Sequence, residues 1–103
     1  MAIKHFHHKG LEKFHYNGDT AGINVKHANK LIRILDAIEA SHHPCDLKSI
    51  YQHRFSEKKG AGKGVFSIQV NGNWRVTFEV SDEGASFLDY CDYHGKKIKS
   101  RTS

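Results

Sequence analysis

Alternation of apolar and polar residues in the second half of the chain is the feature that most constrains the fold. Between residues 65 and 80 two segments place apolar residues at every second position, namely Phe66, Ile68 and Val70, then Trp74, Val76, Phe78 and Val80. Side chains of a β-strand point alternately to opposite faces, so each segment predicts a strand with one face in a core. Residues 85–90 predict a third strand after a turn at 81–84. We therefore expect a small, antiparallel-rich sheet.

In the connection between the first two of these strands, the turn residues and the apolar register point to different lengths. Asn71 and Gly72 are typical of a two-residue hairpin turn, but this register places Ile68 opposite Arg75, so that apolar positions meet polar ones. Setting Val70 opposite Trp74 aligns the apolar faces instead. We predict a three-residue connection, residues 71–73, or a β-bulge close by, with Arg75 facing away from the core helices.

The first half of the chain predicts helices. A helical i, i+3, i+4, i+7 spacing relates the apolar residues Val25, Ala28, Leu31, Ile32, Leu35 and Ile38. Asn24 is suited to cap this helix, which ends near Ser41 because Pro44 prevents continuation. A shorter helix carries Leu11 and Phe14 and ends at residues 17–18. Residues 3–6 predict a short strand, 19–23 a loop and 46–51 one further helical turn, which gives the element order of an α+β domain.

Length and charge limit the classes of function. A chain of 103 residues, 38% hydrophobic, suffices for one modest core, so we expect a single domain at 1–94 and a basic, disordered tail at 95–103. The formal net charge of +5 favours anionic partners. No apolar run approaches the roughly 20 residues that span a bilayer, and the first ten residues are too polar for a signal peptide, so we expect a cytoplasmic protein. Cys45 and Cys91 form no CxxC pair and should be reduced there.

Two strand segments carry side chains suited to phosphate chemistry. Arg75 lies in the second predicted strand, and Asp89, Tyr90, Cys91, Asp92, Tyr93 and His94 end the third. An arginine supplies charge for a phosphate, while Asp and His donate or accept protons near neutral pH. The combination suggests RNA cleavage.

Three stretches together resemble a known family: IKHFHHKGLEKF near the N-terminus, NGNWRVTFEV, and DYCDYH. Over residues 3–94 the chain is similar to the HigB host-inhibition toxins of the RelE/ParE superfamily, which are bacterial mRNA interferases. The resemblance implies a small sheet packed on one face by two N-terminal helices, with an open concave face that binds RNA. It also implies cleavage of mRNA in the decoding site of a translating 70S ribosome, no metal or other cofactor, and a HigA-like antitoxin with a helix-turn-helix domain.

Carried over by position, the basic and catalytic residues of the family fall on Lys59, Arg75, Asp92, Tyr93 and His94, with His53 as a further candidate. In relatives the active-site His precedes the Lys by three residues, whereas His53 precedes Lys59 by six, and Arg54 stands where Pro is usual. Either the loop contains a three-residue insertion and His53 keeps its place, which we favour, or His94 transfers protons without it. The loop is rich in cations, and we predict RNA contacts by Arg54, Lys58 and Lys63.

The implied chemistry is transesterification within RNA. A base removes the proton of the 2′-hydroxyl, that oxygen attacks the adjacent phosphorus, and an acid protonates the departing 5′-oxygen. Lys59 and Arg75 suit the charge that develops on phosphorus, and His94 suits proton transfer, with Asp92 either orienting it or acting as the base. Tyr93 is better suited to stacking or phosphate positioning than to ionisation.

Other functions remain open at this point. The pairs His7-His8 and His42-His43 invite a zinc hypothesis, but adjacent histidines usually point apart, and we expect no metal site. A gyrase inhibitor of the ParE branch shares the fold and would not need Asp92 and His94. A catalytically inactive module that binds RNA or an antitoxin would result if the altered loop has broken the site.

Overall fold

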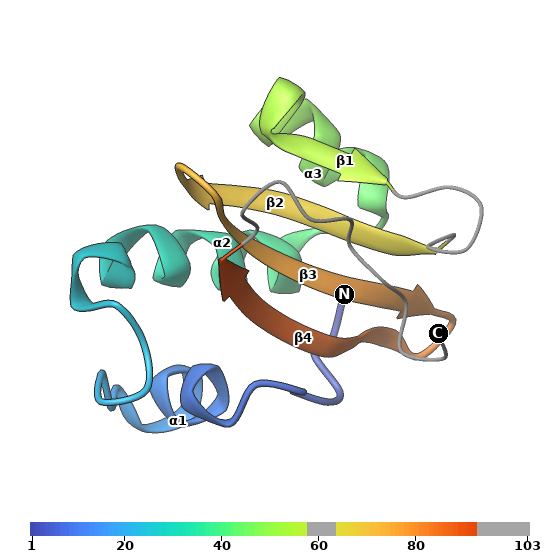
Figure 1. Ribbon diagram of the computed structural model, residues 1–103. Coiled ribbons are helices and arrows are strands. Elements are labelled where there is room, and N and C mark those ends of the chain that lie inside the picture. Colours follow the sequence, from blue (N-terminus) through green and yellow to red (C-terminus); the bar gives the residue numbers. More distant parts are fainter. Residues whose placement is uncertain (58–63, 93–103) are drawn as a thin grey trace.

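A computed structural model describes residues 1–57 and 64–92 and shows an α+β fold, as the sequence predicts. Within these residues one four-stranded antiparallel sheet has the order β1-β2-β3-β4 (Figure 1). Its strands are β1 (Phe55–Glu57), β2 (Val65–Asn71), β3 (Trp74–Ser81) and β4 (Gly84–Asp92). The helical segments are α1 (Lys9–Asn17), η1 (Val25–His27), α2 (Ala28–Ala40), α3 (Pro44–Tyr51) and η2 (Gln52–Arg54).

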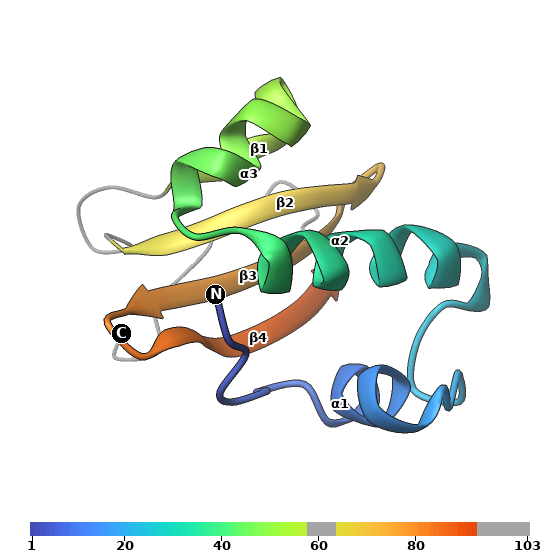
Figure 2. The same cartoon turned by 180° about the vertical axis from the view of Figure 1, so that it is seen from behind.

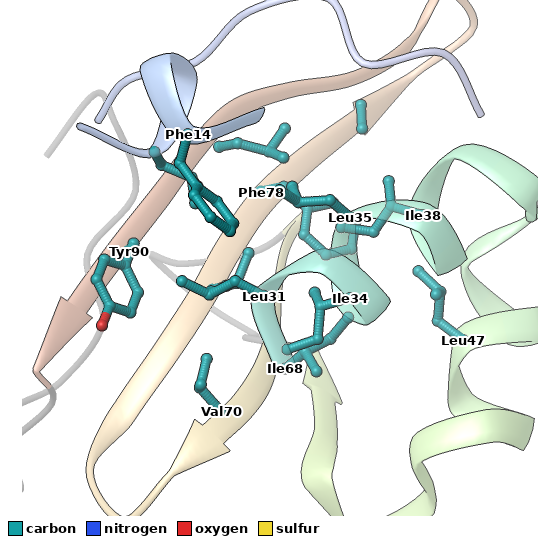
Figure 3. Packing of buried hydrophobic residues seen from close by; sticks show 14 residues of the cluster. Phe14, Leu31, Ile34, Leu35, Ile38, Leu47, Ile68, Val70, Phe78 and Tyr90 are labelled. Carbon is teal, nitrogen blue, oxygen red and sulfur yellow. The ribbon is translucent and has the colours of Figure 1, made fainter. Parts of the chain in front are cut away.

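Helices cover one face of the sheet. Figure 2 shows α2 lying across β2 and β3, with α1 toward the β4 edge and α3 in front of β1. The core between these layers consists mainly of aliphatic side chains from α2 and the sheet, with contributions from α1 and α3 (Figure 3). Its largest fully buried members include Leu11, Leu31, Leu35, Leu47, Ile68 and Phe78. Among the described residues, no helix lies on the opposite face of the sheet.

The buried face of α2 differs from the predicted one. Ile34 is buried, whereas Val25 and Ile32 are 66% and 47% exposed. Ile32 lies about 100° around the helix axis from the buried Leu31, which turns it away from the sheet. The first turn is the 3₁₀ helix η1, capped as predicted by the Asn24 side chain, which accepts from the Lys26 N–H. This tighter turn takes Val25 out of the α-helical register.

The helix ends follow local chemistry. Gly18 ends α1 in a left-handed conformation (φ 72°), as predicted, and α2 stops at Ser41. Pro44 occupies the first turn of α3, and the Asp46 carboxylate accepts from the backbone N–H groups of His42 and His43, which lowers the Asp46 pKa. Because this capping box starts the helix at Pro44, α3 is longer than the predicted single turn.

The N-terminal segment is not the regular strand predicted at 3–6. It forms isolated parallel bridges with β4, Ile3 with Ala85 and Phe6 with Leu88. Gly84, at φ 132°, lets this segment approach, because a Cβ there would overlap the Ala2 carbonyl oxygen. The segment therefore covers the free edge of β4 without continuing the sheet.

The hairpin between β2 and β3 contains the predicted β-bulge. Ile68 pairs with Val76, so the apolar faces align, and the register shifts between Gln69 and Asn71. The bulge places Asn71, not Val70, opposite Trp74, and the turn is Gly72 and Asn73, two residues and not three. One extra residue in β2 therefore resolves the conflict between turn length and apolar register.

A second bulge lies in β4 and has no clear signal in the sequence. The register with β3 shifts between Thr77 and Glu79, and Phe87 in the opposing stretch has a positive φ of 55°. The extra residue allows Ala85 and Leu88 to be buried on the same face although they are three positions apart, and Phe87 is 40% exposed.

The predicted loop at residues 54–63 contains a short strand. Residues 55–57, predicted as part of a loop, form β1 because they pair with 66–68 of β2. Residues 58–63 and the predicted tail at 95–103 lie outside the described residues. Cys45 is exposed and Cys91 is half-buried; their reduced state stays a prediction.

Two features are absent from the part of the chain that the structure describes. None of the helices there has the length and apolar character to cross a membrane. Residues 1–57 and 64–92 contain no group of three or more His, Cys, Asp or Glu side chains placed to hold a metal ion.

Candidate active site

The sheet face opposite the helices is lined by polar side chains. Strand pairing sets Ser56, Ser67, Thr77 and Asp89 in one row across the four strands, and Gln69, Arg75 and Cys91 in the next. Ile68 and Val76, on the alternate positions, are fully buried in the core, so these rows point to the other side. We call this surface the open face because none of the described helices covers it, although Ser67 and Thr77 within it are buried. Gln69 and Arg75, which are partly exposed, suit contact with a phosphate backbone.

Arg75 is on the open face, as the sequence predicts. It lies between Gln69 of β2 and Cys91 of β4 and is partly buried. Its neighbours along the strand, Trp74 and Val76, pack toward the helices. A guanidinium on a central strand is held more firmly than one on a loop, which suits a role in stabilising charge.

Asp92 lies at the same end of the sheet but not in the same row as Arg75. It is the exposed last residue of β4 and pairs with Trp74, while Arg75 pairs with Cys91. Strand alternation therefore puts Asp92 on the Trp74 side of the sheet. The sequence correctly placed the two residues on neighbouring strands, but it did not predict this separation. Tyr93 and His94 lie outside the described residues.

His53 and Arg54 approach the same end of the sheet from η2. His53 is exposed and follows Gln52, whose φ of 53° and ψ of −120° are strained for a residue with a side chain. The Arg54 Nη2 atom donates to the carbonyl oxygens of Gln69 and Val70, at 2.9 and 3.0 Å. Arg54, predicted as an RNA contact, is thus bound to the β2 bulge. The predicted residues Lys58, Lys59 and Lys63 lie outside the described part of the chain.

An aromatic cluster supports this end of the sheet from the helix side. The Trp74 ring stacks on Tyr90 with centroids 4.6 Å apart, and the Tyr90 hydroxyl lies 2.6 Å from His27 Nδ1. His27 is 3% exposed, and its burial, with a smaller effect of Lys30, lowers its pKa. Burial raises the pKa of Tyr90. No sequence motif points to His27, although it precedes Leu31 and Ile34 by four and seven residues, so that it extends the apolar face of α2 into η1.

The lowered pKa of His27 predicts that acid destabilises the fold. Above about pH 6.5 the residue is neutral in both the folded and the unfolded chain. As the pH falls below that value, the unfolded chain binds a proton that the folded chain excludes, so the free energy of unfolding decreases, by at most about 1.4 kcal/mol per pH unit. Urea denaturation at pH 7.5, 6.5 and 5.5 measures this. In a His27→Asn variant the free energy of unfolding should lose this part of its pH dependence. If the pH dependence is unchanged in the variant, other histidines cause it.

Comparisons with known proteins agree with the sequence motifs. Residues 4–94 match the family model of the HigB-like toxins, described as the RelE-like toxin of type II toxin-antitoxin system HigB. The chain is also similar to the Endoribonuclease HigB of Proteus vulgaris, with 36% identity over 93 residues that cover 89% of this chain and 99% of the relative.

Proposed function

This chain belongs to the HigB-like toxin family of type II toxin-antitoxin systems, and on that premise we propose that it is an endoribonuclease that cleaves mRNA on the translating ribosome. The observation that carries the proposal is its similarity to an Endoribonuclease HigB over nearly the full length of that relative. Membership of a toxin-antitoxin family implies an antitoxin partner, which we propose to be a HigA-like helix-turn-helix protein. Action on translating ribosomes would take place in the cytoplasm.

The position of Arg75 supports this function. Its guanidinium projects from the polar open face, at the end of the sheet where β4 leads to Asp92. In the proposed mechanism the 2′-hydroxyl of the substrate attacks phosphorus, and Arg75 with Lys59 stabilises the negative charge of the phosphorane. His94 and Asp92 transfer protons, with His53 as a further candidate, and Tyr93 positions the substrate. Because Asp92 lies on the Trp74 side of the sheet, this mechanism requires the reacting phosphate to sit at the end of β3 and β4, where both sides can be reached. Because the nucleophile comes from RNA, DNA would not be cut.

Mapping cleavage sites on one mRNA tests the proposal. The purified protein is incubated with the mRNA with and without programmed ribosomes, and primer extension locates the cuts. We expect cuts within codons only when ribosomes are present, and their loss in His94→Ala. His42→Ala, an exposed histidine that lines a pocket beside the β3–β4 turn at the other end of the sheet, should cut normally.

Two outcomes would contradict the proposal. Intact mRNA under every condition, together with inhibition of gyrase supercoiling, would favour the ParE-like alternative. Intact mRNA without gyrase inhibition, but with binding of RNA or antitoxin, would favour a catalytically inactive module.

A further inference from the structure

Arg54 occupies the place where β1 would otherwise continue along β2. β1 begins at Phe55, which pairs with Ile68, so the next pair in the ladder would join Arg54 to Gln69. The Arg54 side chain instead donates to the carbonyl oxygens of Gln69 and Val70. A β-bulge leaves its extra residue outside the regular ladder, and here a charged donor satisfies the carbonyl groups around it.

The bulge lies beside the residue pair that contains Arg75. Gln69, on one side of the bulge, pairs with Arg75, and Asn71, on the other side, pairs with Trp74. A slip of one residue in a strand moves every side chain to the opposite face. Without the extra residue, β2 could not pair Gln69 with Arg75 and Asn71 with Trp74 at the same time, so loss of the bulge would change how Arg75 pairs with β2.

The approach of Arg54 to the bulge is itself constrained. Its guanidinium carbon lies 6.0 Å from the centre of the Tyr51 ring, at the end of α3. The strained backbone of Gln52 makes the turn between Tyr51 and Arg54. Such strain persists only where surrounding contacts maintain it, and the two hydrogen bonds of Arg54 are contacts of this kind.

We propose that Arg54 is a positioning residue for Arg75: by holding the β2 bulge it keeps Gln69 paired with Arg75 and so fixes the position of the Arg75 guanidinium for catalysis. The proposal rests on the proposed nuclease function. It is an alternative to the sequence-based prediction that Arg54 contacts RNA.

Cleavage kinetics separate the two roles. If Arg54 positions Arg75, Arg54→Ala should lower kcat about 10- to 100-fold, because small misplacements of a catalytic group cost this much, while KM changes less than about twofold. The salt dependence of RNA binding should stay that of the wild type. If Arg54 contacts a phosphate, KM should rise and the slope of log K against log salt should fall by about 0.7 to 1; this result would overturn the proposal.

Two variants provide the controls. Arg54→Lys keeps the charge but not the flat, forked guanidinium. If Arg54 positions Arg75, this variant should keep the KM of the wild type and the low kcat of Arg54→Ala; a recovery of kcat by lysine would overturn the proposal. It also serves as a second variant if Arg54→Ala folds poorly. Arg33→Ala removes another positive charge that, like Arg54, acts to lower the pKa of Tyr51; Arg33 lies on the exposed side of α2. Arg33→Ala should leave kcat unchanged. If it lowers kcat as much as Arg54→Ala does, the loss in both variants follows from the lower net charge, and the proposal is overturned.

Hydrogen exchange tests whether Arg54 holds the β2 bulge, and this measurement does not depend on RNA cleavage. In the free protein, Arg54→Ala should lower the protection of the Arg75 and Asn71 amides at least tenfold, whereas Arg33→Ala should not. Unchanged protection would overturn the proposal even if cleavage is lost. If the wild type cleaves no RNA, the proposed function fails, and the exchange result still decides whether Arg54 holds this strand.

Discussion

Arg75→Ala is expected to lower the rate of RNA cleavage by about 10²- to 10³-fold, the usual cost of removing one donor from a site that stabilises developing negative charge. The expectation follows from the position of Arg75 on the open face, between Gln69 and Cys91. Single-turnover cleavage on programmed ribosomes measures the rate, and circular dichroism confirms that the variant is folded.

Arg75→Lys and Arg33→Ala are the matched controls. Lysine keeps the charge but loses the planar fork, so Arg75→Lys should recover only part of the rate. Arg33→Ala removes the same charge from the exposed side of α2 and should cut at nearly the wild-type rate. Wild-type cleavage by a folded Arg75→Ala variant would remove Arg75 from the catalytic site.

Phe78→Ala is expected to lower the free energy of unfolding by about 3–5 kcal/mol. Phe78 is 1% exposed at the centre of β3, and its ring lies 5.8 Å from that of Phe66. Its removal leaves a cavity between the sheet and α2 that close-packed neighbours fill only in part. Urea denaturation monitored by circular dichroism measures the loss.

Phe87→Ala is the matched control, since it removes the same side chain from the same sheet. The β4 bulge turns Phe87 outward, where it is 40% exposed, so its removal should change stability by less than about 1 kcal/mol. If both variants lose the same free energy of unfolding, the β4 bulge and the assignment of Phe78 to the core and Phe87 to the surface would be wrong.

Local sequence patterns predicted much of the fold. Alternating residues in β2 and β3 and the spacing of Leu31, Leu35 and Ile38 identified elements that depend mainly on one apolar face. The capping residue Asn24 and the left-handed Gly18 act within a few residues, so the sequence was sufficient for them. The predicted buried face of α2 contained Ile32 and left out Ile34, whereas Ile34 is buried and Ile32 is exposed. A helix with apolar residues on several sides does not itself specify which side meets the sheet.

The candidate site was predictable in part for a similar reason. Strand alternation placed Arg75 on the face away from the helices, and pairing confirmed it. The position of Asp92 relative to Arg75 depends on how β4 pairs with β3, and the role of Arg54 depends on carbonyl groups 15 and 16 residues away in the chain. Contacts across such distances have no local signal.

The sequence by itself determined the α+β class, the principal helices and strands, the family and the candidate chemistry, because periodicity, caps and motifs are properties of neighbouring residues. Only the tertiary structure decided between a three-residue connection and a bulge after β2. It alone also decided the β4 bulge, the short β1, the pairing of His27 with Tyr90 and the attachment of Arg54 to β2. These features are settled when elements distant in the chain pack together, since burial then requires that apolar faces align and that polar groups find partners.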